Sequence, residues 1–218
     1  MVTPNVDHLV RYCEDPTFRS LYRCAEYTLL DSRVLALAIR LLRRQRLGVC
    51  TGSDLTAELL GRIAAPADCI VVIGGSEPQA RRLARRYGLQ VHHHDPPMGF
   101  IDDAAATEAC LRFIEAHSPF RFCFLAVGSP QQELLAQRLQ VRGTARGLVL
   151  CVGAALNFLA GTERRAPRWM QRLALEWLYR LLLDPRRLAA RYLLRGPRII
   201  RYLLRGRLVV RARVRQSS

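Results

Sequence analysis

The chain has 218 residues, half of them hydrophobic, and a formal net charge of +16. This length suits one sizeable domain with an appendage, and the hydrophobic content excludes wholesale disorder. So large a positive charge predicts an anionic partner: nucleic acid, a phosphorylated ligand or an anionic lipid surface. All 34 basic residues are arginine, which a GC-rich genome explains as well as forked phosphate contacts do.

Seven cysteines are scattered along the chain without CxxC spacing. Those in apolar, strand-like runs (Cys69, Cys123 and Cys151) are expected to be buried free thiols, which predicts a reducing, cytoplasmic compartment. No signal peptide is expected from the sequence, and no apolar run in it reaches the roughly 18 residues of a spanning helix. Any membrane contact is therefore expected to be peripheral.

The first third of the chain predicts helices with polar caps. Asn5 or Asp7 can cap a helix over 8–13, and Asp15-Pro16 begins another that runs to residue 24. Apolar residues at helical spacing predict a third helix over 33–46, directly after Asp31-Ser32.

The middle of the chain alternates strands with helices. Strands are predicted over 69–73, 90–93, 121–127 and 147–152, and a further short strand over 48–51. Helices are predicted over 55–63, capped by Ser53 or Asp54, and over 79–87, 103–117 and 134–139. This alternation indicates βαβ units, so we expect a Rossmann-like α/β domain with a largely parallel sheet covered on both faces.

The last fifty residues have a different character. From Pro167 an apolar stripe (Met170, Leu173, Trp177 and Leu181) predicts one long helix to Asp184, and shorter helical runs follow over 186–194 and 198–204. From Pro185 onward there are eleven arginines and no acidic residue. A solvated tail and a nucleic-acid-binding arm are both open, but arginine interleaved with Leu, Ile and Tyr favours amphipathic helices on an anionic membrane.

Two strands are followed by glycine turns that lead into helices. They are Gly74-Gly75-Ser76 and Gly128-Ser129-Pro130. Glycine lets the backbone approach a ligand, and a helix start favours phosphate, so two such turns at one sheet edge suit a diphosphate. Ordinary tight turns are the alternative.

Several carboxylates and histidines could act in catalysis or metal binding, but each could instead have a purely structural role. Asp31 follows an apolar strand-like stretch and could act as a general base, or it could cap the helix that starts at residue 33. For Asp54 and Asp103 a capping role is favoured. The run His92-His93-His94 lacks a spaced third ligand, so a metal site is not expected there.

Taken in order, these motifs resemble the WecG/TagA/CpsF family of bacterial glycosyltransferases. The matching stretches are Thr3-Pro4-Asn5-Val6-Asp7-His8-Leu9, Asp31, Thr51-Gly52-Ser53-Asp54-Leu55, Gly74-Gly75, Gly128-Ser129-Pro130 with Gln132-Glu133, GAALNFLAGTERRAPRWM and LEWLYRLLLDPRRLAARYL. The similarity runs from Val2 to about Leu194.

The resemblance implies transfer of a hexose or N-acetylhexosamine-type sugar from a UDP-sugar to an undecaprenyl-diphosphate-linked acceptor in cell-surface polysaccharide synthesis. Inversion at the anomeric carbon is implied, without a metal ion or other cofactor. The implied partners are the UDP-sugar, the lipid-linked glycan and the anionic cytoplasmic face of the bacterial inner membrane, rather than nucleic acid. Whether the chain forms a homo-oligomer is left open.

The same resemblance assigns residues to roles. Asp31 corresponds to the general base. The residues expected to bind substrate are Thr3, Asn5, Gly52, Ser53, Asp54, Gly74, Gly75, Gly128, Ser129, Gln132, Arg165, Arg180, Arg187 and Arg191. Among these, Arg180, Arg187 and Arg191 lie where the family's C-terminal appendage is thought to bring arginines over the donor diphosphate.

Three positions depart from the family pattern. Ser32 replaces the usual glycine, Gln131 the usual lysine and Asn157 the usual aspartate. These departures leave one alternative open, a catalytically weakened family member that acts as a membrane-surface scaffold. The strongly basic composition leaves another, a basic nucleic-acid-binding protein. The favoured organisation is a glycosyltransferase domain over 1–166, followed by an arginine-rich helical appendage over 167–218 that forms a membrane-facing lid.

Overall fold

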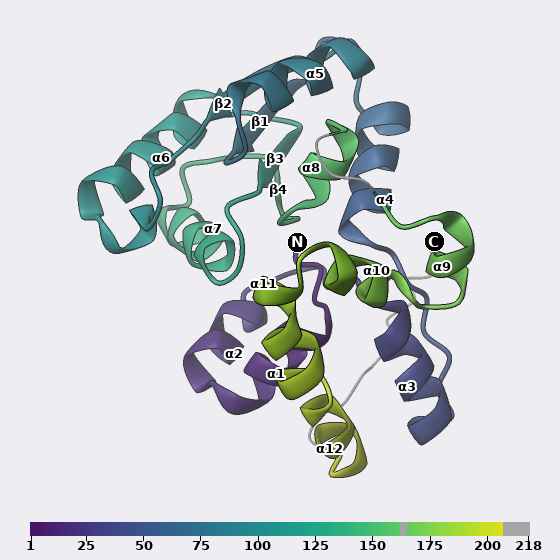
Figure 1. The fold of residues 1–218 in the computed structure, drawn as a ribbon. Coiled ribbons are helices and arrows are strands. Elements are labelled where there is room, and N and C mark those ends of the chain that lie inside the picture. Colours follow the sequence, from purple (N-terminus) through teal and green to yellow (C-terminus); the bar gives the residue numbers. More distant parts are fainter. Residues whose placement is uncertain (162–164, 207–218) are drawn as a thin grey trace, which may run out of the picture. The chain divides into compact units, whose positions relative to one another are not determined.

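A computed structural model describes residues 1–161 and 165–206 (Figure 1). The chain forms two compact units, each assembled from separate stretches. The first unit comprises residues 1–3, 20–29 and 50–165, and the second comprises 4–19, 30–49 and the chain from Ala166 onward. Residues 207–218, the end of the predicted appendage, lie outside the described part. The functional division at residue 166 stays a prediction.

The first unit contains a four-stranded sheet in which every strand is parallel to its neighbours. The strands are β1 (Cys69–Ile73), β2 (Gln90–His94), β3 (Phe122–Leu125) and β4 (Leu148–Cys151), in the spatial order β2-β1-β3-β4. At their carboxyl ends Ile73 is paired with both His94 and Leu125, and Leu125 with Cys151. The four strands therefore end in line, and the α/β class with a parallel sheet is confirmed.

Apolar residues on both sides of the strands explain why helices cover both faces. One face carries Ile70, Phe122, Phe124 and Leu150, which pack with Leu83 and with residues of three further short elements. The elements on this face are α5 (Glu77–Tyr87), α4 (Gly52–Glu58) with the π-helix η1 (Leu59–Ile63), and α8 (Ala155–Leu159). On the opposite side of the strands lie α6 (Ala104–Ala116), preceded by the 3-10 turn η2 (Phe100–Asp102), and α7 (Gln131–Arg142) (Figure 1).

The second unit is helical and joins the two ends of the chain. Its helices are α1 (Val6–Glu14), α3 (Arg33–Arg43), α9 (Arg168–Arg172), α10 (Glu176–Leu183), α11 (Pro185–Ala189), the π-helix η3 (Ala190–Arg195) and α12 (Arg198–Leu204). The helix α2 (Pro16–Arg23) crosses from the second unit into the first. A core of Val10, Leu35, Ile39, Ile199 and Leu203 fastens α12 to α1 and α3.

Two predicted elements are wrong. No strand forms over 48–51, which the structure describes as coil. The predicted long helix after Pro167 is broken: α9 ends at Arg172, α10 begins at Glu176, and Ala174 between them has the left-handed φ of 59°. The break interrupts the expected stripe, since Met170 is buried whereas Leu173 is 62% exposed. Within the described part of the chain, no helix is long and apolar enough to cross a membrane.

Candidate active site

The two glycine turns lie on neighbouring strands at the carboxyl edge of the sheet. From β1 the chain crosses to β2 on one side, and the next strand, β3, pairs with β1 on its other side. The strand order thus reverses between β1 and β3, where the turns Gly74-Gly75 and Gly128-Ser129 begin. In open parallel sheets such a switch point is the place where ligands bind.

The backbone of the first turn is packed against that of the second. Gly74 has φ +89°, and a Cβ atom there would lie 2.8 Å from Cγ1 of Val127 and 3.0 Å from the carbonyl carbon of Ala126. No larger residue fits without movement of the neighbouring turn. The Gly74 N–H donates to the carbonyl of His94 over 2.8 Å, so it continues the sheet and is not a donor to a ligand.

The second turn leads into α7, whose first residues are buried. The helix begins at Gln131, three residues earlier than predicted. Gln132 donates from Nε2 to Oε1 of Glu133 over 2.9 Å, and its Oε1 accepts the Gly153 N–H over 3.0 Å. Both polar ends of Gln132 therefore have protein partners, which hold its side chain in place.

Glu133 is a buried carboxyl group that the sequence analysis treated only as part of a motif. It is 3% exposed, and its Oε1 also lies 3.5 Å from the Tyr22 hydroxyl, which donates to it. Burial raises the pKa of Glu133, and the bond from Gln132 opposes this only in part. The sequence signal that could have indicated this buried carboxyl group is the pair of adjacent polar residues, Gln132 and Glu133, at the start of a helix.

Thr3 lies at the same edge of the sheet. Its hydroxyl donates over 3.1 Å to the carbonyl of Cys151, the last residue of β4, and Val2 makes an isolated parallel bridge to that residue. Thr3 is therefore held beside the carboxyl end of β4.

The stretch from Thr51 to Asp54 differs from its prediction. The helix begins at Gly52, and its cap is Thr51, whose Oγ1 accepts the Asp54 N–H over 3.1 Å. Ser53 is buried and its hydroxyl lies 3.2 Å from that of Thr51. Neither Ser53 nor Asp54 is the cap, so the capping role favoured for Asp54 is wrong.

Asp54 instead pairs with Arg165, which lies 111 residues later. The Arg165 guanidinium donates to both carboxylate oxygens, over 3.1 Å to Oδ2, and to the Thr51 hydroxyl over 3.2 Å. This forked arrangement fixes the guanidinium beside the start of α4. Arg165 and Asp54, both expected to bind substrate, are brought together as a pair within the protein.

Asp31 and Asn5 belong to the second unit. Ser32, not Asp31, caps α3: its Oγ accepts the Leu35 N–H over 3.2 Å. The alternative in which the Asp31 carboxylate serves as the cap is therefore wrong. The Asp31 backbone N–H donates to Pro4, which holds residue 31 beside the start of the chain. Asn5 caps α1 by accepting the N–H groups of Asp7 and His8.

The appendage arginines differ in what they contact. Arg180 pairs with Glu176 at 2.7 Å and Arg187 with Asp184 at 2.5 Å, both in the appendage itself. Arg191 reaches the N-terminal segment, donating to Oδ1 of Asn5 over 3.2 Å and lying 3.7 Å from the buried carboxylate of Asp7. Asp7, which sequence reasoning considered as a cap and as part of the matching stretch, is thus a buried carboxylate beside Arg191.

The predicted residues thus fall into two groups. Thr3, the glycine turns, Gln132 and the Asp54–Arg165 pair belong to the first unit. Asp31, Asn5 and the three appendage arginines belong to the second unit. Their assembly into one site stays a prediction.

The remaining sequence candidates have structural roles. Asp103 caps α6 by accepting the N–H groups of Ala105 and Ala106, as expected. His94 stacks on Phe113 of α6, and the His92 ring contacts that of His117, the residue directly after α6. Among the described residues, no group of three or more His, Cys, Asp or Glu is arranged to hold a metal ion.

Comparison with known protein families agrees with this geometry. The model of the glycosyl transferase WecG/TagA/CpsF family matches residues 1–213. The match covers both units, including the appendage arginines, so the two groups of candidate residues fall within one family pattern.

Proposed function

Because the chain belongs to the WecG/TagA/CpsF family of glycosyltransferases, we propose that it transfers a sugar from a UDP-sugar to a polyprenyl-diphosphate-linked acceptor. The donor sugar is a hexose or N-acetylhexosamine, and the anomeric carbon is inverted. The reaction serves cell-surface polysaccharide synthesis at the cytoplasmic face of the inner membrane.

The observation that carries the proposal is the pair of glycine turns at the switch point of the sheet. Strand order reverses between β1 and β3, and the first turn packs directly on the second. A switch point of this kind, at which two glycine turns lead into helices, suits the diphosphate of a nucleotide sugar.

The proposed chemistry is a single displacement. Asp31 takes the proton of the acceptor hydroxyl while that oxygen forms a bond to the anomeric carbon. The bond from the anomeric carbon to the UDP oxygen breaks on the opposite face, so configuration is inverted. The charge that develops on departing UDP is stabilised by turn N–H groups and by Arg187 and Arg191, and these preorganised donors act in place of a metal ion.

A lipid-linked acceptor requires the enzyme to lie on a membrane. Supporting this, apolar residues are exposed among the arginines of the second unit: Leu182, Leu183, Leu194 and Leu204 are each more than 60% exposed. Arginine beside exposed leucine suits the interface of an anionic bilayer. Co-sedimentation with anionic vesicles is expected to exceed binding to duplex DNA at matched salt, and the reverse result would favour the nucleic-acid alternative.

The decisive experiment is UDP release in the presence of a polyprenyl-diphosphate-linked acceptor. Asp31→Asn is expected to lower the turnover number by roughly 10²- to 10⁴-fold, the usual range for a lost general base, while UDP affinity is kept. Asp103→Asn is the matched control, because asparagine also caps a helix. Full turnover in Asp31→Asn would refute the base assignment, and absence of UDP release by the natural chain would favour the scaffold.

A further inference from the structure

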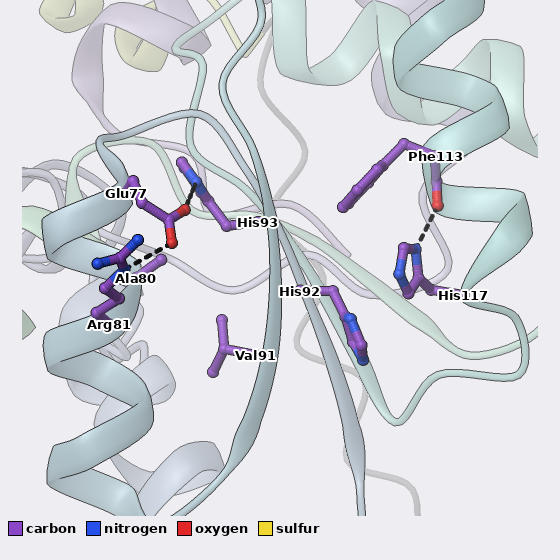
Figure 2. Close-up of a pocket in the computed structure, with 8 residues that line it drawn as sticks. All are labelled: Glu77, Ala80, Arg81, Val91, His92, His93, Phe113 and His117. Atoms are coloured by element: carbon purple, nitrogen blue, oxygen red, sulfur yellow. Dashed lines mark hydrogen bonds and ion pairs between the residues drawn. The ribbon is translucent and has the colours of Figure 1, made fainter.

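One histidine of β2 joins the first glycine turn to the helix that follows it. The His93 side chain is 6% exposed, and its Nε2 lies 3.3 Å from the carbonyl oxygens of both Gly74 and Gly75. On the other side of the ring, Nδ1 lies 3.0 Å from Oε2 of Glu77, near the start of α5 (Figure 2). The ring therefore spans the turn and the first residues of α5.

Both nitrogens of this ring face groups that accept hydrogen bonds. A carbonyl oxygen and an ionised carboxylate have no proton to donate, whereas a neutral imidazole donates from only one nitrogen. Both contacts are hydrogen bonds only when the ring carries a proton on each nitrogen. Arg81 donates to the other Glu77 oxygen over 2.9 Å, and this bond, followed by that to His93, lowers the pKa of Glu77. Glu77 is thus held as an acceptor.

Because of the geometry of the peptide unit, the contact between His93 and the Gly74 carbonyl also determines where the next N–H points. In a trans peptide the carbonyl of one residue and the N–H of the next point in opposite directions. With the Gly74 carbonyl directed at His93, the Gly75 N–H is directed away from the ring. The Ser76 N–H already donates to Oε1 of Gln79 over 2.8 Å. His93 thereby sets the direction of the Gly75 N–H.

We propose that His93, in its doubly protonated form, is the positioning residue of the Gly74-Gly75 turn, aiming the Gly75 N–H at the donor diphosphate. This rests on the proposed function, in which that turn binds UDP-sugar. The ring also places a positive charge directly behind the turn, and a deprotonated ring must give up one of its two contacts.

Other titratable groups surround His93, and each must be separated from it in a test. Glu77 and Arg81 face it from α5, and His92 and His94 flank it on β2. His117, the residue directly after α6, lines a cavity of about 270 Å³ together with His92, His93, Glu77 and Arg81 (Figure 2). Burial lowers the pKa of His92 and of His94, with a smaller contribution from His117 and His93, respectively.

The experiment compares His93→Ala with His92→Ala, which changes the neighbouring residue on the other side of the strand. UDP affinity is measured by calorimetry at about pH 6 and about pH 9, values that bracket the ordinary titration of histidine. His93→Ala is expected to weaken UDP binding about tenfold at pH 6, the effect of one lost charge-assisted bond. Between pH 6 and pH 9, the natural chain and His92→Ala are expected to lose more UDP affinity than His93→Ala does. The titration of UDP itself affects all three proteins equally and cancels in this comparison.

A second measurement does not depend on UDP. Amide hydrogen exchange at Gly74, whose N–H donates to the carbonyl of His94, is expected to be faster in His93→Ala than in His92→Ala, because the turn loses its anchor. Unchanged UDP affinity and unchanged exchange in His93→Ala would overturn the proposal, and equal pH dependence in all three proteins would overturn its doubly protonated form. Faster Gly74 exchange in His93→Ala, in a protein that binds no UDP, would instead refute the proposed donor and leave the anchoring role of His93 standing.

Discussion

His8 is a buried histidine held between two arginines. It is 8% exposed, and burial first, then the positive charges of Arg191 and Arg11, lower its pKa to about 3. Its ring cannot take up a proton in the folded second unit without losing stability. In the unfolded chain the same ring titrates near the ordinary value of 6.5.

This difference predicts a loss of stability in mild acid. Below pH 6.5, His8 binds a proton in the unfolded chain but not in the folded one. The free energy of unfolding therefore falls as the pH is lowered from 6.5 to about 3. At pH 5 the loss attributable to His8 is about 2 kcal/mol, at 1.36 kcal/mol for each pH unit. Urea titrations of the natural chain and His8→Gln from pH 8 to pH 5 measure it. The natural chain should show the steeper decline, and parallel declines would contradict the shift.

The two glycine turns offer a matched pair of substitutions. Gly74 and Gly128 have nearly the same left-handed φ, +89° and +80°, but a Cβ at Gly74 meets the neighbouring turn whereas one at Gly128 meets nothing within 4 Å. Gly128→Ala should cost about 1 to 2 kcal/mol of backbone strain. Gly74→Ala adds the steric overlap and should cost clearly more. Chemical denaturation of both variants decides this, and equal costs would show that the close packing of the turns is absent.

At the residue scale the motifs could be predicted from the sequence, but the residues with which their side chains pair could not. Asp31-Ser32 and Thr51 to Asp54 each contain several residues able to cap a helix. The choice depends on which one takes extended backbone, as Ser32 and Thr51 do. The pairing of Asp54 with Arg165 joins residues 111 positions apart. No local pattern carries that information.

At the scale of elements, the strands were easier to predict than the last helices. β1 is buried along nearly its whole length, so its apolar run has one interpretation, and its predicted bounds are confirmed. The segment after Pro167 has helical spacing throughout, yet Ala174 adopts a left-handed conformation and breaks it. The spacing of apolar residues does not reveal a single residue with left-handed φ, unless that residue is a glycine.

Neighbouring leucines of α12 test how that helix is held. Leu203 is 1% exposed in the core with Val10 and Leu35, whereas Leu204 is 65% exposed. Leu203→Ala should lower the free energy of unfolding by about 2 to 5 kcal/mol, the cost of a buried leucine cavity. Leu204→Ala, the matched control, should change it by less than about 0.5 kcal/mol. Equal effects would mean that α12 does not pack on α1 and α3 through this face.

At the scale of the whole molecule, the appendage is a structural part of its unit. Ile199 and Leu203 complete a core whose other members, Val10, Leu35 and Ile39, come from the first forty residues. The main core of the first unit, by contrast, ends at Ala160. Arg187 and Arg191, which we propose for the diphosphate, lie on α11 and η3, directly before α12, the helix that completes this core.

A chain that ends after Arg165 should accordingly lose more than its arginines. We expect α1 and α3 to lose protection from amide hydrogen exchange, because their apolar faces are left uncovered, while β1, β3 and β4 keep theirs. A chain that ends after Gly206 retains α12 and is the control. Full protection of α1 and α3 in the shorter chain would show that the second unit folds without the appendage.

The same reasoning determines how the arginines are to be tested in transfer. Loss of activity on truncation would reflect the uncovered core as much as the missing charge. Arg187→Gln changes an exposed side chain that, among the described residues, pairs within its own segment with Asp184, so it removes charge and leaves the core intact. We expect it to lower transfer about tenfold or more, as loss of one donor to the departing diphosphate should, with unchanged stability toward urea. Arg186→Gln, one residue earlier and also exposed, is the control, and equal activity of the two variants would exclude Arg187 from the site.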